Sequence, residues 1–556
     1  MVIYRSPLAN VPAVEEDLYH YLFESTDKPA DNAVMYVDPD SRVSCTFGSL
    51  RTQVRCFADA LRSKFGARRG DVIAFILPNS MEFPLLLFGA IAAGLTVTAV
   101  NPAYPADDAV HQLQDSDARF LVADHATMEA SLHIASAANI PEDRVLMVGA
   151  PMEKEEHQHG WKALDVFMEG ARANTPARLP RCELKTTAAV ICYTSGTTGK
   201  SKGAMITHSN IVNRLECYKQ FDCPYYARFS QPLVQISYLP FYHIFGVVTG
   251  ILMPFQRRSP VVIMRQYQLE RLLSLTQEYR VQLLYVVPPI CVSLATSPLV
   301  DKYDLSCLRE IISASAPLAQ ELIDTVHRRL NIDVRQQYGM TEMTMMTHAT
   351  LPEQSNQANV GVLMANTEAK LIDSEGRELP AGATGELCIR STGNIIGYRN
   401  NPEATAATID TDGYIHTGDI ASVDEQGRFQ IVDRIKEVIK YKGFQVAPTE
   451  LEDLLCTHEA VSDAVVVPVE QPLQGTELPK ALVVLNANYV GKIDPQDLAQ
   501  YIADRVVAYK KLRGGVEFID AIPYSPAGKK LRRVLREREN SPIGIASGVA
   551  MGNSTA

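Results

Sequence analysis

Cysteine pairs of the kind that bind metals or build disulfide frameworks are missing from this sequence. Its ten cysteines are scattered through 556 residues, none forms a Cys-x-x-Cys pair, and none has a histidine at metal-ligand spacing. A disulfide scaffold or zinc module is therefore not expected, and reduced thiols in an intracellular enzyme are the simpler interpretation. The first residues run into the acidic Glu15–Asp17 without an apolar core, so no secretory signal is predicted.

An excess of positive charge is also missing. Lys and Arg number 53 against 64 Asp and Glu, which gives a formal net charge of −11. Proteins that bind nucleic acids more often carry a basic excess, so no nucleic-acid partner is expected. An anionic small molecule remains compatible, because a local cluster of positive charge can lie inside an acidic protein.

One uncharged stretch, Phe83–Val100, reaches the length of a membrane span. Gly89 and Gly94 interrupt it, and Leu95–Val100 is rich in residues that favour strands. The pattern predicts a buried helix followed by a buried parallel strand, and no transmembrane segment.

Short apolar runs alternate with amphipathic helical patterns through the first four hundred residues. Strands are expected at Val72–Leu77, Phe120–Ala123, Ala188–Cys192, Val261–Met264, Leu283–Val287 and Glu310–Ile312, and helices at Arg51–Phe65 and Leu269–Tyr279. Such alternation predicts an α/β fold, with layers around largely parallel sheets. The polar segment Pro151–Pro180 is predicted to be an exposed connection, with His157 and His159 in a solvated loop.

The strongest motif is the run Tyr193–Gly203, which follows the apolar Ala188–Cys192 and holds three Gly, five Ser or Thr and two Lys. Glycines let backbone N–H groups approach oxyanions, hydroxyls donate hydrogen bonds and lysines neutralise charge, as a polyphosphate requires. A Walker A loop is excluded on spacing, because it needs Gly where Thr194 stands.

Four further motifs are weak alone and carry chemistry together. An aromatic beside Gly can stack on a base, a Thr and Glu can meet phosphate and a metal, an Asp after a turn can hold ribose hydroxyls, and a loop Lys can present a point charge. They are Gln336–Glu342, Tyr414–Asp419, Asp433–Gln445 and Ser525–Lys529.

These five motifs, in this order, resemble the adenylate-forming superfamily of acyl-CoA synthetases, non-ribosomal adenylation domains and luciferases. The resemblance spans about Thr46 to Arg536, and the runs Leu239–Gly246 and Ile439–Pro448 are most similar to coumarate–CoA ligases. It implies a large layered N-terminal body with mostly parallel sheets and a small mobile α+β C-terminal domain. The expected boundaries are 1–433 for the adenylation domain, 434–437 for a hinge, 438–540 for the small domain and 541–556 for a disordered tail.

The resemblance implies two half-reactions with ATP, Mg²⁺ and coenzyme A as cofactors. A carboxylate attacks the α-phosphate of ATP, and a thiol then displaces AMP from the acyl-adenylate. The implied phosphate ligands are Thr194, Ser195, Gly196, Thr197, Thr198, Gly199 and Lys202. The other implied nucleotide and metal ligands are Ser315 and Gln336 near adenine, Tyr338 stacked on it, Asp419 and Arg434 on ribose, Thr341 on the α-phosphate and Glu342 on Mg²⁺.

By the same resemblance Lys529 is the adenylation lysine. Lys436 lies at the hinge, about which the small domain exchanges Lys529 for a second face that carries Lys440, Lys442, Gly443 and Gln445 near the thiol path. His243 is expected between the acyl pocket and that path.

The expected acyl pocket contains Phe245, Thr249, Ala314 and Gln337. Coumarate ligases usually have Gly in place of Ala314 and Gln337 and often Tyr in place of Phe245, so hydroxycinnamate itself is in doubt. Nearby methionines add soft apolar lining and favour an apolar aryl or aliphatic acid. The expected function is an acid–CoA ligase, and the alternative is an acyl-AMP ligase that loads a carrier protein. The expected compartment is the cytoplasm, since Ser554–Ala556 lacks the basic residue of a peroxisomal tripeptide.

Overall fold

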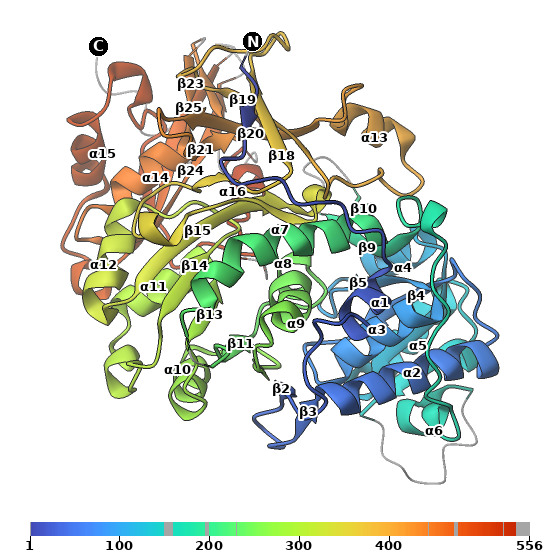
Figure 1. Ribbon diagram of the computed structural model, residues 1–556. Coiled ribbons are helices and arrows are strands. Elements are labelled where there is room, and N and C mark those ends of the chain that lie inside the picture. Colours follow the sequence, from blue (N-terminus) through green and yellow to red (C-terminus); the bar gives the residue numbers. More distant parts are fainter. Residues whose placement is uncertain are drawn as a thin grey trace.

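The computed structural model describes residues 2–149, 160–194, 200–229, 231–442, 444–471, 476–525 and 528–540. Helices and sheets alternate and pack in layers, which confirms the predicted α/β class with a large N-terminal body and a smaller C-terminal part (Figure 1). His157, His159 and the predicted tail 541–556 lie outside the described residues.

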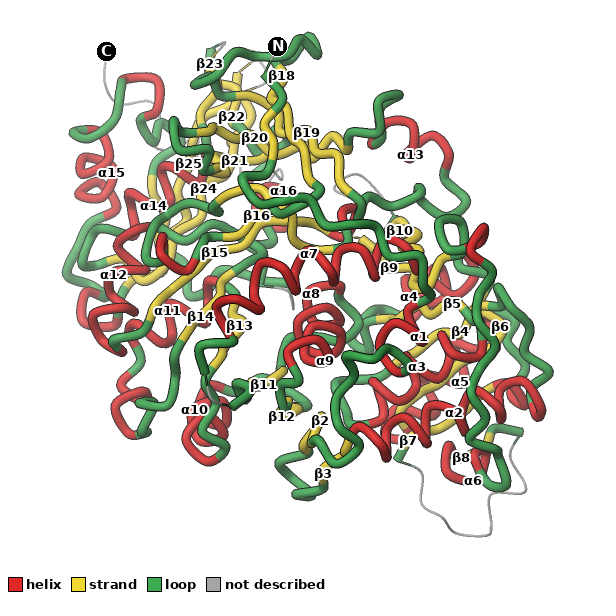
Figure 2. The backbone as a smooth tube through the Cα atoms, viewed as in Figure 1, coloured by secondary structure: helices red, strands yellow, loops and turns green. Residues whose placement is uncertain are grey.

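The first half of the chain builds a mostly parallel sheet, whose strands lie among the helices at the right of Figure 2. Its order is β10 (Lys202–Thr207), β9 (Ala188–Thr194), β5 (Thr96–Val100), β4 (Val72–Ile76), β6 (Ala118–Asp124), β7 (Val145–Val148) and β8 (Lys162–Ala163). Only the pairing of β10 with β9 is antiparallel within this sheet as described.

Strand β4 explains why its sequence is apolar throughout. Ile73 and Phe75 pack toward α2 (Phe47–Lys64) and α3 (Glu82–Ala93), whereas Ala74 and Ile76 pack toward α4 (Ala106–Asp115) and α5 (Met128–Ala137). A strand covered on both faces has no polar side, so alternation disappears.

The uncharged stretch Phe83–Val100 is a buried helix followed by a buried parallel strand, as predicted. It forms most of α3 and all of β5, with Gly94 in the left-handed conformation between them. Of the described helices, none combines the length and apolarity that crossing a membrane would require.

The prediction that Pro151–Pro180 is an exposed connection is wrong for its described middle part. Trp161, Leu164 and Phe167 are buried. Leu164 and Phe167 belong to the short helix α6 (Leu164–Met168) and pack in the main hydrophobic core. The polar residues around these three side chains mask their regular spacing.

A second sheet combines strands from the middle of the chain with two strands from near its start. Its order is β17 (Val362–Leu363), β16 (Met345–Ala349), β15 (Asp333–Met340), β14 (Glu310–Ser313), β13 (Leu283–Val286), β11 (Gln235–Ser237), β12 (Val261–Ile263), β2 (Val34–Val37) and β3 (Ser44–Thr46). The helices of this region are α1 (Leu18–Phe23), α7 (His208–Tyr226), α8 (Ile244–Val247), α9 (Met253–Arg257), α10 (Leu269–Glu278), α11 (Pro288–Thr296) and α12 (Gln320–Leu330). Helix α7 runs between the two sheets (Figure 1).

A third, antiparallel sheet completes the body. Its order is β1 (Tyr4–Arg5), β18 (Thr367–Ile372), β19 (Gly385–Ser391), β20 (Ile415–Val423) and β21 (Phe429–Arg434), with α13 (Pro402–Thr408) between β19 and β20. Strand β21 therefore delivers the chain to the predicted hinge.

The C-terminal part has its own small core. It contains the hairpin β22 (Ile439–Tyr441) and β23 (Phe444–Val446), the sheet β24 (Val461–Gln471), β25 (Thr476–Leu485) and β26 (Val516–Phe518), and the helices α14 (Pro448–Cys456), α15 (Pro495–Ala503) and α16 (Arg532–Glu539). The orange and red elements lie beside α12 in Figure 1, and the loop at Gly528 contacts Val287 just before α11. The boundaries predicted for the domains and hinge stay a prediction.

Candidate active site

Three predicted residues meet at the carboxylate of Asp419. Tyr338 Oη donates a hydrogen bond to Asp419 Oδ2 at 2.7 Å, and Arg434 Nε donates to Asp419 Oδ1 at 3.1 Å. The register of β20 with β21 places Asp419 opposite Arg434. Because a carboxylate accepts about four hydrogen bonds, these two donors leave capacity for a pair of hydroxyl groups.

Gly339 brings strand β15 against strand β16, and the turn between these strands carries the next two predicted residues. A Cβ atom on Gly339 would lie 1.7 Å from the carbonyl oxygen of Met345, so no side chain fits there. The close approach lets β15 end in the short 3-10 turn Thr341–Met343, in which Thr341 and Glu342 are buried. This turn places a hydroxyl and a carboxylate next to Tyr338.

Tyr398 belongs to the same cluster, although the sequence analysis missed it. Tyr398 Oη donates to Glu342 Oε1 at 2.7 Å, and Lys202 Nζ lies 4.8 Å from the centre of the Tyr398 ring. The backbone around Tyr398 bonds to β10, since Arg399 N donates to Gly203 O. An aromatic residue after Gly397 and shortly before the helix start at Pro402 was the available signal.

Glu342 fits a magnesium ion. Its Oε2 atom has no hydrogen-bond partner in the part of the chain that the structure describes, while Oε1 is oriented by Tyr398. Mg²⁺ in nucleotide-binding proteins is commonly held by one or two carboxylates together with phosphate oxygens. Glu342 is the residue that would hold the ion here.

Lys529 reaches this cluster from the C-terminal part. Burial and the nearby positive charge of Arg434 lower the pKa of the Lys529 ammonium to about 8, partly offset by Asp419 and Glu342. Its loop is held by hydrogen bonds with Ser525, which accepts from Lys529 N through Oγ and donates from its own N to Lys529 O. The structure therefore brings a titratable cation to the carboxylates of the large body.

His243 begins helix α8. Its Nδ1 accepts a hydrogen bond from Phe245 N at 3.2 Å, so the ring proton resides on Nε2 in the neutral form. Burial and the charge of Lys529 lower the pKa of His243 to about 4. At neutral pH His243 is therefore an uncharged hydrogen-bond donor, and it lies close enough to Lys529 for an electrostatic interaction.

The four residues of the predicted acyl pocket lie between the second sheet and the helices α8 and α9. The register of β14 with β15 puts Ala314 and Gln337 on the face that also carries Tyr285, and the Phe245 ring packs edge-on to Tyr285 at 6.1 Å. Thr249 Oγ1 donates to Phe245 O at 2.6 Å, so this hydroxyl is used within the helix.

Gln337 differs from its neighbours because its amide is unsatisfied. The side chain is 4% exposed, and neither Oε1 nor Nε2 has a hydrogen-bond partner among the described residues. Leaving a buried amide unpaired costs about 1–3 kcal/mol, so such a group is usually met by a ligand or water.

Gln336 and Ser315 flank the predicted adenine position. Gln336 Nε2 donates to the carbonyls of Gln357 and Asn359, and its Oε1 accepts from Leu318 N at 2.8 Å. Ser315 adopts the left-handed backbone conformation at φ 78°. Gln336 thus joins the two loops that border the site, and its direct contact with a nucleotide stays a prediction.

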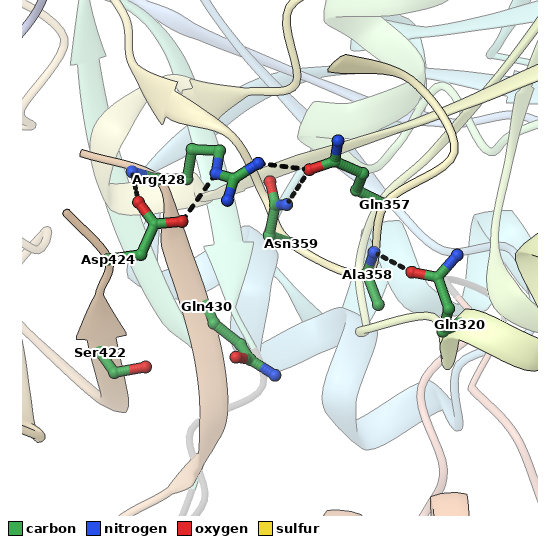
Figure 3. A pocket seen from close by; sticks show the side chains of 8 residues that line it. All are labelled: Gln320, Gln357, Ala358, Asn359, Ser422, Asp424, Arg428 and Gln430. Atoms are coloured by element: carbon green, nitrogen blue, oxygen red, sulfur yellow. Dashed lines mark hydrogen bonds and ion pairs between the residues drawn. The ribbon is translucent and has the colours of Figure 1, made fainter. Parts of the chain in front are cut away.

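A polar cavity of about 310 Å³ lies behind these loops (Figure 3). In it Arg428 bridges Asp424 and Gln357, with Nε donating to Asp424 Oδ2 at 2.7 Å and Nη1 to Gln357 Oε1 at 2.5 Å. The residues predicted for the site do not line this cavity.

The phosphate-binding loop is described only at its ends. Thr194 ends β9, Lys202 begins β10, and the two are direct cross-strand partners. Ser195, Gly196, Thr197, Thr198 and Gly199 lie outside the described residues.

The described residues of the second predicted face make their contacts within the C-terminal part. Lys440 and Gln445 are exposed cross-strand partners on the β22–β23 hairpin, Lys440 N donates to Glu477 Oε2 and Lys442 N to Thr476 Oγ1. Phe444 stacks on Tyr509 at 4.6 Å. These contacts all lie within the C-terminal part. Lys436 is exposed between β21 and β22, and Gly443 lies outside the described residues.

Asp433 connects the two parts of the molecule and was also missed as a functional residue. Its Oδ2 accepts from Thr449 N in the first turn of α14 at 3.0 Å, and its Oδ1 accepts from Arg434 N at 2.7 Å. Burial raises the pKa of Asp433 to about 6 despite these hydrogen bonds.

Comparison with known protein families matches two models along this chain. Residues 22–399 match the AMP-binding enzyme family, and residues 450–529 match the AMP-binding enzyme C-terminal domain. The chain is 35% identical over 547 residues to a 4-coumarate–CoA ligase of Pinus taeda, covering 96% of this chain and 97% of the relative. A 4-coumarate–CoA ligase of Petroselinum crispum is also 35% identical, over 555 residues that cover 98% and 97% of the two chains.

A solved structure has the same fold over nearly the whole chain. ATP-bound MatB from Rhodopseudomonas palustris superposes with a TM-score of 0.84 and 25% identity, covering 95% of this chain and 99% of that chain. The likeness therefore includes both the large body and the C-terminal part.

Proposed function

Because the chain belongs to the AMP-binding family of adenylate-forming enzymes and is an ATP-dependent, AMP-forming acid–CoA ligase, we propose that the cluster around Asp419, Glu342 and Lys529 is its adenylation site. In the first half-reaction a carboxylate oxygen of the acid attacks the α-phosphorus of ATP, the bond to the bridging oxygen breaks and pyrophosphate leaves. In the second, the CoA sulfur attacks the acyl carbon and AMP leaves.

The juxtaposition of Lys529 with the large body is the observation that carries this proposal. The attacking carboxylate and the triphosphate are both anions, and a cation between them lowers the barrier to their approach. With a pKa of about 8, Lys529 is mostly protonated at neutral pH and can act as that cation. Asp419 holds the ribose hydroxyls, Tyr338 stacks on adenine and Thr341 contacts the α-phosphate.

Glu342 holds Mg²⁺ in this proposal. When bound, the ion would neutralise charge on the phosphate oxygens. Tyr398 keeps Glu342 oriented by donating to Oε1, and it holds Lys202 over its ring beside the predicted phosphate loop. Lys202 and the Ser195–Gly199 loop bind the β- and γ-phosphates.

The acid is an apolar aryl or aliphatic carboxylic acid bound along Phe245, Thr249, Ala314 and Gln337. Phe245 and Thr249 are buried and expose no free hydroxyl to the acid, which supports an apolar body for the substrate. The unpaired amide of Gln337 supports one hydrogen-bonding position along that body. Neutral His243 stands between the acyl pocket and the thiol path.

The second half-reaction requires that the C-terminal part rotate about residues 434–437, with Lys436 at the pivot. Rotation would withdraw Lys529 and present Lys440, Lys442, Gly443 and Gln445 to the thiol. Exposure of this hairpin supports the idea that it is available for another position. The relatives are named CoA ligases, which supports coenzyme A as the acceptor.

A pyrophosphate-release assay tests the proposal directly. The purified enzyme is given ATP, Mg²⁺ and single acids from aryl, medium-chain and long-chain series, with and without CoA, and thioesters are identified by mass spectrometry. We expect pyrophosphate with a subset of apolar acids and acyl-CoA only when CoA is present. Absence of acid-dependent pyrophosphate across all series would overturn the proposal.

A further inference from the structure

Three side chains with metal-binding atoms converge on neighbouring strands of the third sheet. Glu386 and Cys388 lie on β19 and His416 lies on β20, where Cys388 and His416 are direct cross-strand partners. Glu386 and Cys388 are two residues apart on one strand, so their side chains share a face, and their ligand atoms lie close to that of the histidine. The arrangement is formed by strand pairing and does not depend on a flexible loop.

The distances between these atoms match a tetrahedral site. His416 Nδ1 lies 3.7 Å from Cys388 Sγ and 3.6 Å from Glu386 Oε2, and all three ligand atoms lie within 4.8 Å of one another. With metal bonds of about 2.3 Å to sulfur and about 2.0–2.1 Å to nitrogen and oxygen, neighbouring ligands of tetrahedral zinc lie about 3.3–3.6 Å apart. Only small movements would bring the three atoms onto one ion.

The groups behind the ligands are those that orient metal ligands in proteins. His416 Nε2 lies 3.7 Å from Asp410 Oδ2, on the opposite side of the ring from Cys388. Asp410 Oδ1 is fixed by the backbone N–H groups of Asp412 and Tyr414, and Glu386 Oε1 accepts from Gly418 N at 3.1 Å. A carboxylate behind a ligating histidine fixes the ring and raises its basicity.

Charge and access also fit a divalent ion. Glu386 and Asp410 are carboxylates, and Lys370 lies 3.3 Å from Asp410 and 3.9 Å from Glu378. A divalent ion that displaces the proton of the Cys388 thiol would offset the negative charge gathered there. Cys388 is buried, whereas the side chains of His416 and Glu386 are 32% and 19% exposed, which leaves one side open to water. Thiolate and imidazole select zinc over magnesium.

We propose that Glu386, Cys388 and His416 form a Zn²⁺ site, with water as the fourth ligand and Asp410 as the partner of His416. The site is distinct from the magnesium position at Glu342. It joins β19 to β20 three residues before Asp419, so the bound ion fixes the strand that carries the ribose ligand.

Cobalt substitution tests the site with a readout other than activity. Bound metal is removed from the full-length enzyme with a chelator, and the cysteines are reduced. The added thiol reductant is then removed, and the protein is titrated with Co²⁺. We expect a thiolate-to-cobalt charge-transfer band and tetrahedral d–d bands that saturate at one equivalent and disappear on addition of Zn²⁺. Absence of these bands would overturn the proposal, as would saturation only at many equivalents.

Variants locate the signal. The substitutions Cys388→Ser and His416→Asn should each abolish the bands. Circular dichroism must show that both variants are folded. Asp410→Asn should weaken Co²⁺ affinity by about 10–100-fold. Cys182→Ser is the matched control, since Cys182 is an exposed thiol elsewhere, and it should keep the bands. Unchanged bands in folded Cys388→Ser would refute the assignment.

A second cluster in the described chain supplies an internal comparison. Glu16, Asp17 and His20 also approach one another, but they contain no thiol, and His20 and Asp17 already pair at the start of α1. Cobalt bound there would lack the charge-transfer band. The band therefore distinguishes the proposed site from this cluster.

Discussion

Gly528 and Val287 touch across the junction of the C-terminal part with the large body. A Cβ atom on Gly528 would lie 2.6 Å from Val287 Cβ, and Gly528 has φ +75°, so this residue must be glycine on two grounds. The contact fixes how closely the Lys529 loop approaches the start of α11. In this arrangement Lys529 reaches the site with Gly528 against Val287.

The Gly528→Ala substitution should slow adenylation selectively. The left-handed backbone alone costs about 1–2 kcal/mol for a residue with a Cβ, which corresponds to roughly 5–30-fold, and the contact with Val287 adds to this. Acid-dependent pyrophosphate release measures the loss. Gly491→Ala is the control, because Gly491 has φ +73° with open space around it, and it should leave adenylation unchanged. Equal effects of the two variants would contradict the docking role.

The Lys529→Ala substitution should lower adenylation by about 10²–10³-fold, because it removes the cation that offsets the developing charge. Thioester formation from supplied acyl-AMP should persist, since that step does not use Lys529. Stopped-flow assays of each half-reaction separate the two. Arg533→Ala removes an exposed cation from the nearby helix α16 and should be silent. Equal loss in both half-reactions would argue against rotation of the C-terminal part.

Adenylation should fall as pH rises through about 8, because the lowered pKa of Lys529 means that its charge is lost at that pH. The value of kcat/KM for pyrophosphate release reports groups of the free enzyme and is the quantity to measure. Arg434→Gln should move the descending limb to higher pH, since Arg434 depresses that pKa. Lys529→Arg should remove the limb within this range. A limb retained in Lys529→Arg would assign it to another group.

The stability of the Asp433→Asn variant relative to the wild type should depend on pH. The folded-state pKa of Asp433 is raised from 3.8 to about 6, so the folded protein binds this proton more tightly than the unfolded chain. The free energy of unfolding of the wild type therefore declines between pH 4 and 6. Over that window the free energy of unfolding of Asp433→Asn should rise relative to the wild type by on the order of 2 kcal/mol, and the difference should stay level above pH 6. Urea unfolding at several pH values measures the difference.

Asp424→Asn is the matched control for that experiment. Hydrogen bonds from Arg428 and its backbone lower the pKa of Asp424 despite partial burial, so the wild-type carboxylate adds stability as pH rises through its lowered value. The free energy of unfolding of Asp424→Asn should therefore fall relative to the wild type as pH rises, which is the opposite of the change expected for Asp433→Asn. The same sign for both variants would rule out the assigned ionisations.

Shortening Gln337 should enlarge the acyl pocket. Gln337→Ala removes a buried side chain with an unpaired amide, so bulky aryl acids should gain relative to small acids, by about tenfold or more in the ratio of kcat/KM. Competition between two acids in one reaction gives that ratio directly. Gln53→Ala, on the exposed face of α2, should leave the ratio unchanged. An unchanged ratio in Gln337→Ala would place the residue outside the pocket.

The elements that sequence predicted well are those with a uniform environment. Val72–Leu77 lies between two helical layers, so its continuous apolar run is sufficient evidence for a central strand. Phe83–Val100 was resolved by Gly94, whose left-handed conformation ends the helix. Trp161 and Phe167 were misjudged because charged neighbours obscured two large apolar side chains that fill the core.

The site residues that the sequence predicted lie in short motifs. The residues that it missed are recognised only by contacts with residues elsewhere in the chain. Tyr398 became visible only through Glu342, and Asp433 only through Thr449, because their roles rest on contacts between separate elements. Cys388 and His416 are 28 positions apart and become neighbours through strand register. Spacing rules for metal ligands operate within short segments and do not detect such pairs.

The hydrogen bonds from Tyr338 and Arg434 to Asp419 have a thermodynamic consequence for whatever that carboxylate binds. Its orientation is already restricted in the folded chain, so the conformational entropy of ordering it is lost during folding. A ligand with two adjacent hydroxyls then meets an acceptor that needs no further ordering. Nucleotide binding therefore requires a smaller loss of conformational entropy, because folding has already ordered this carboxylate.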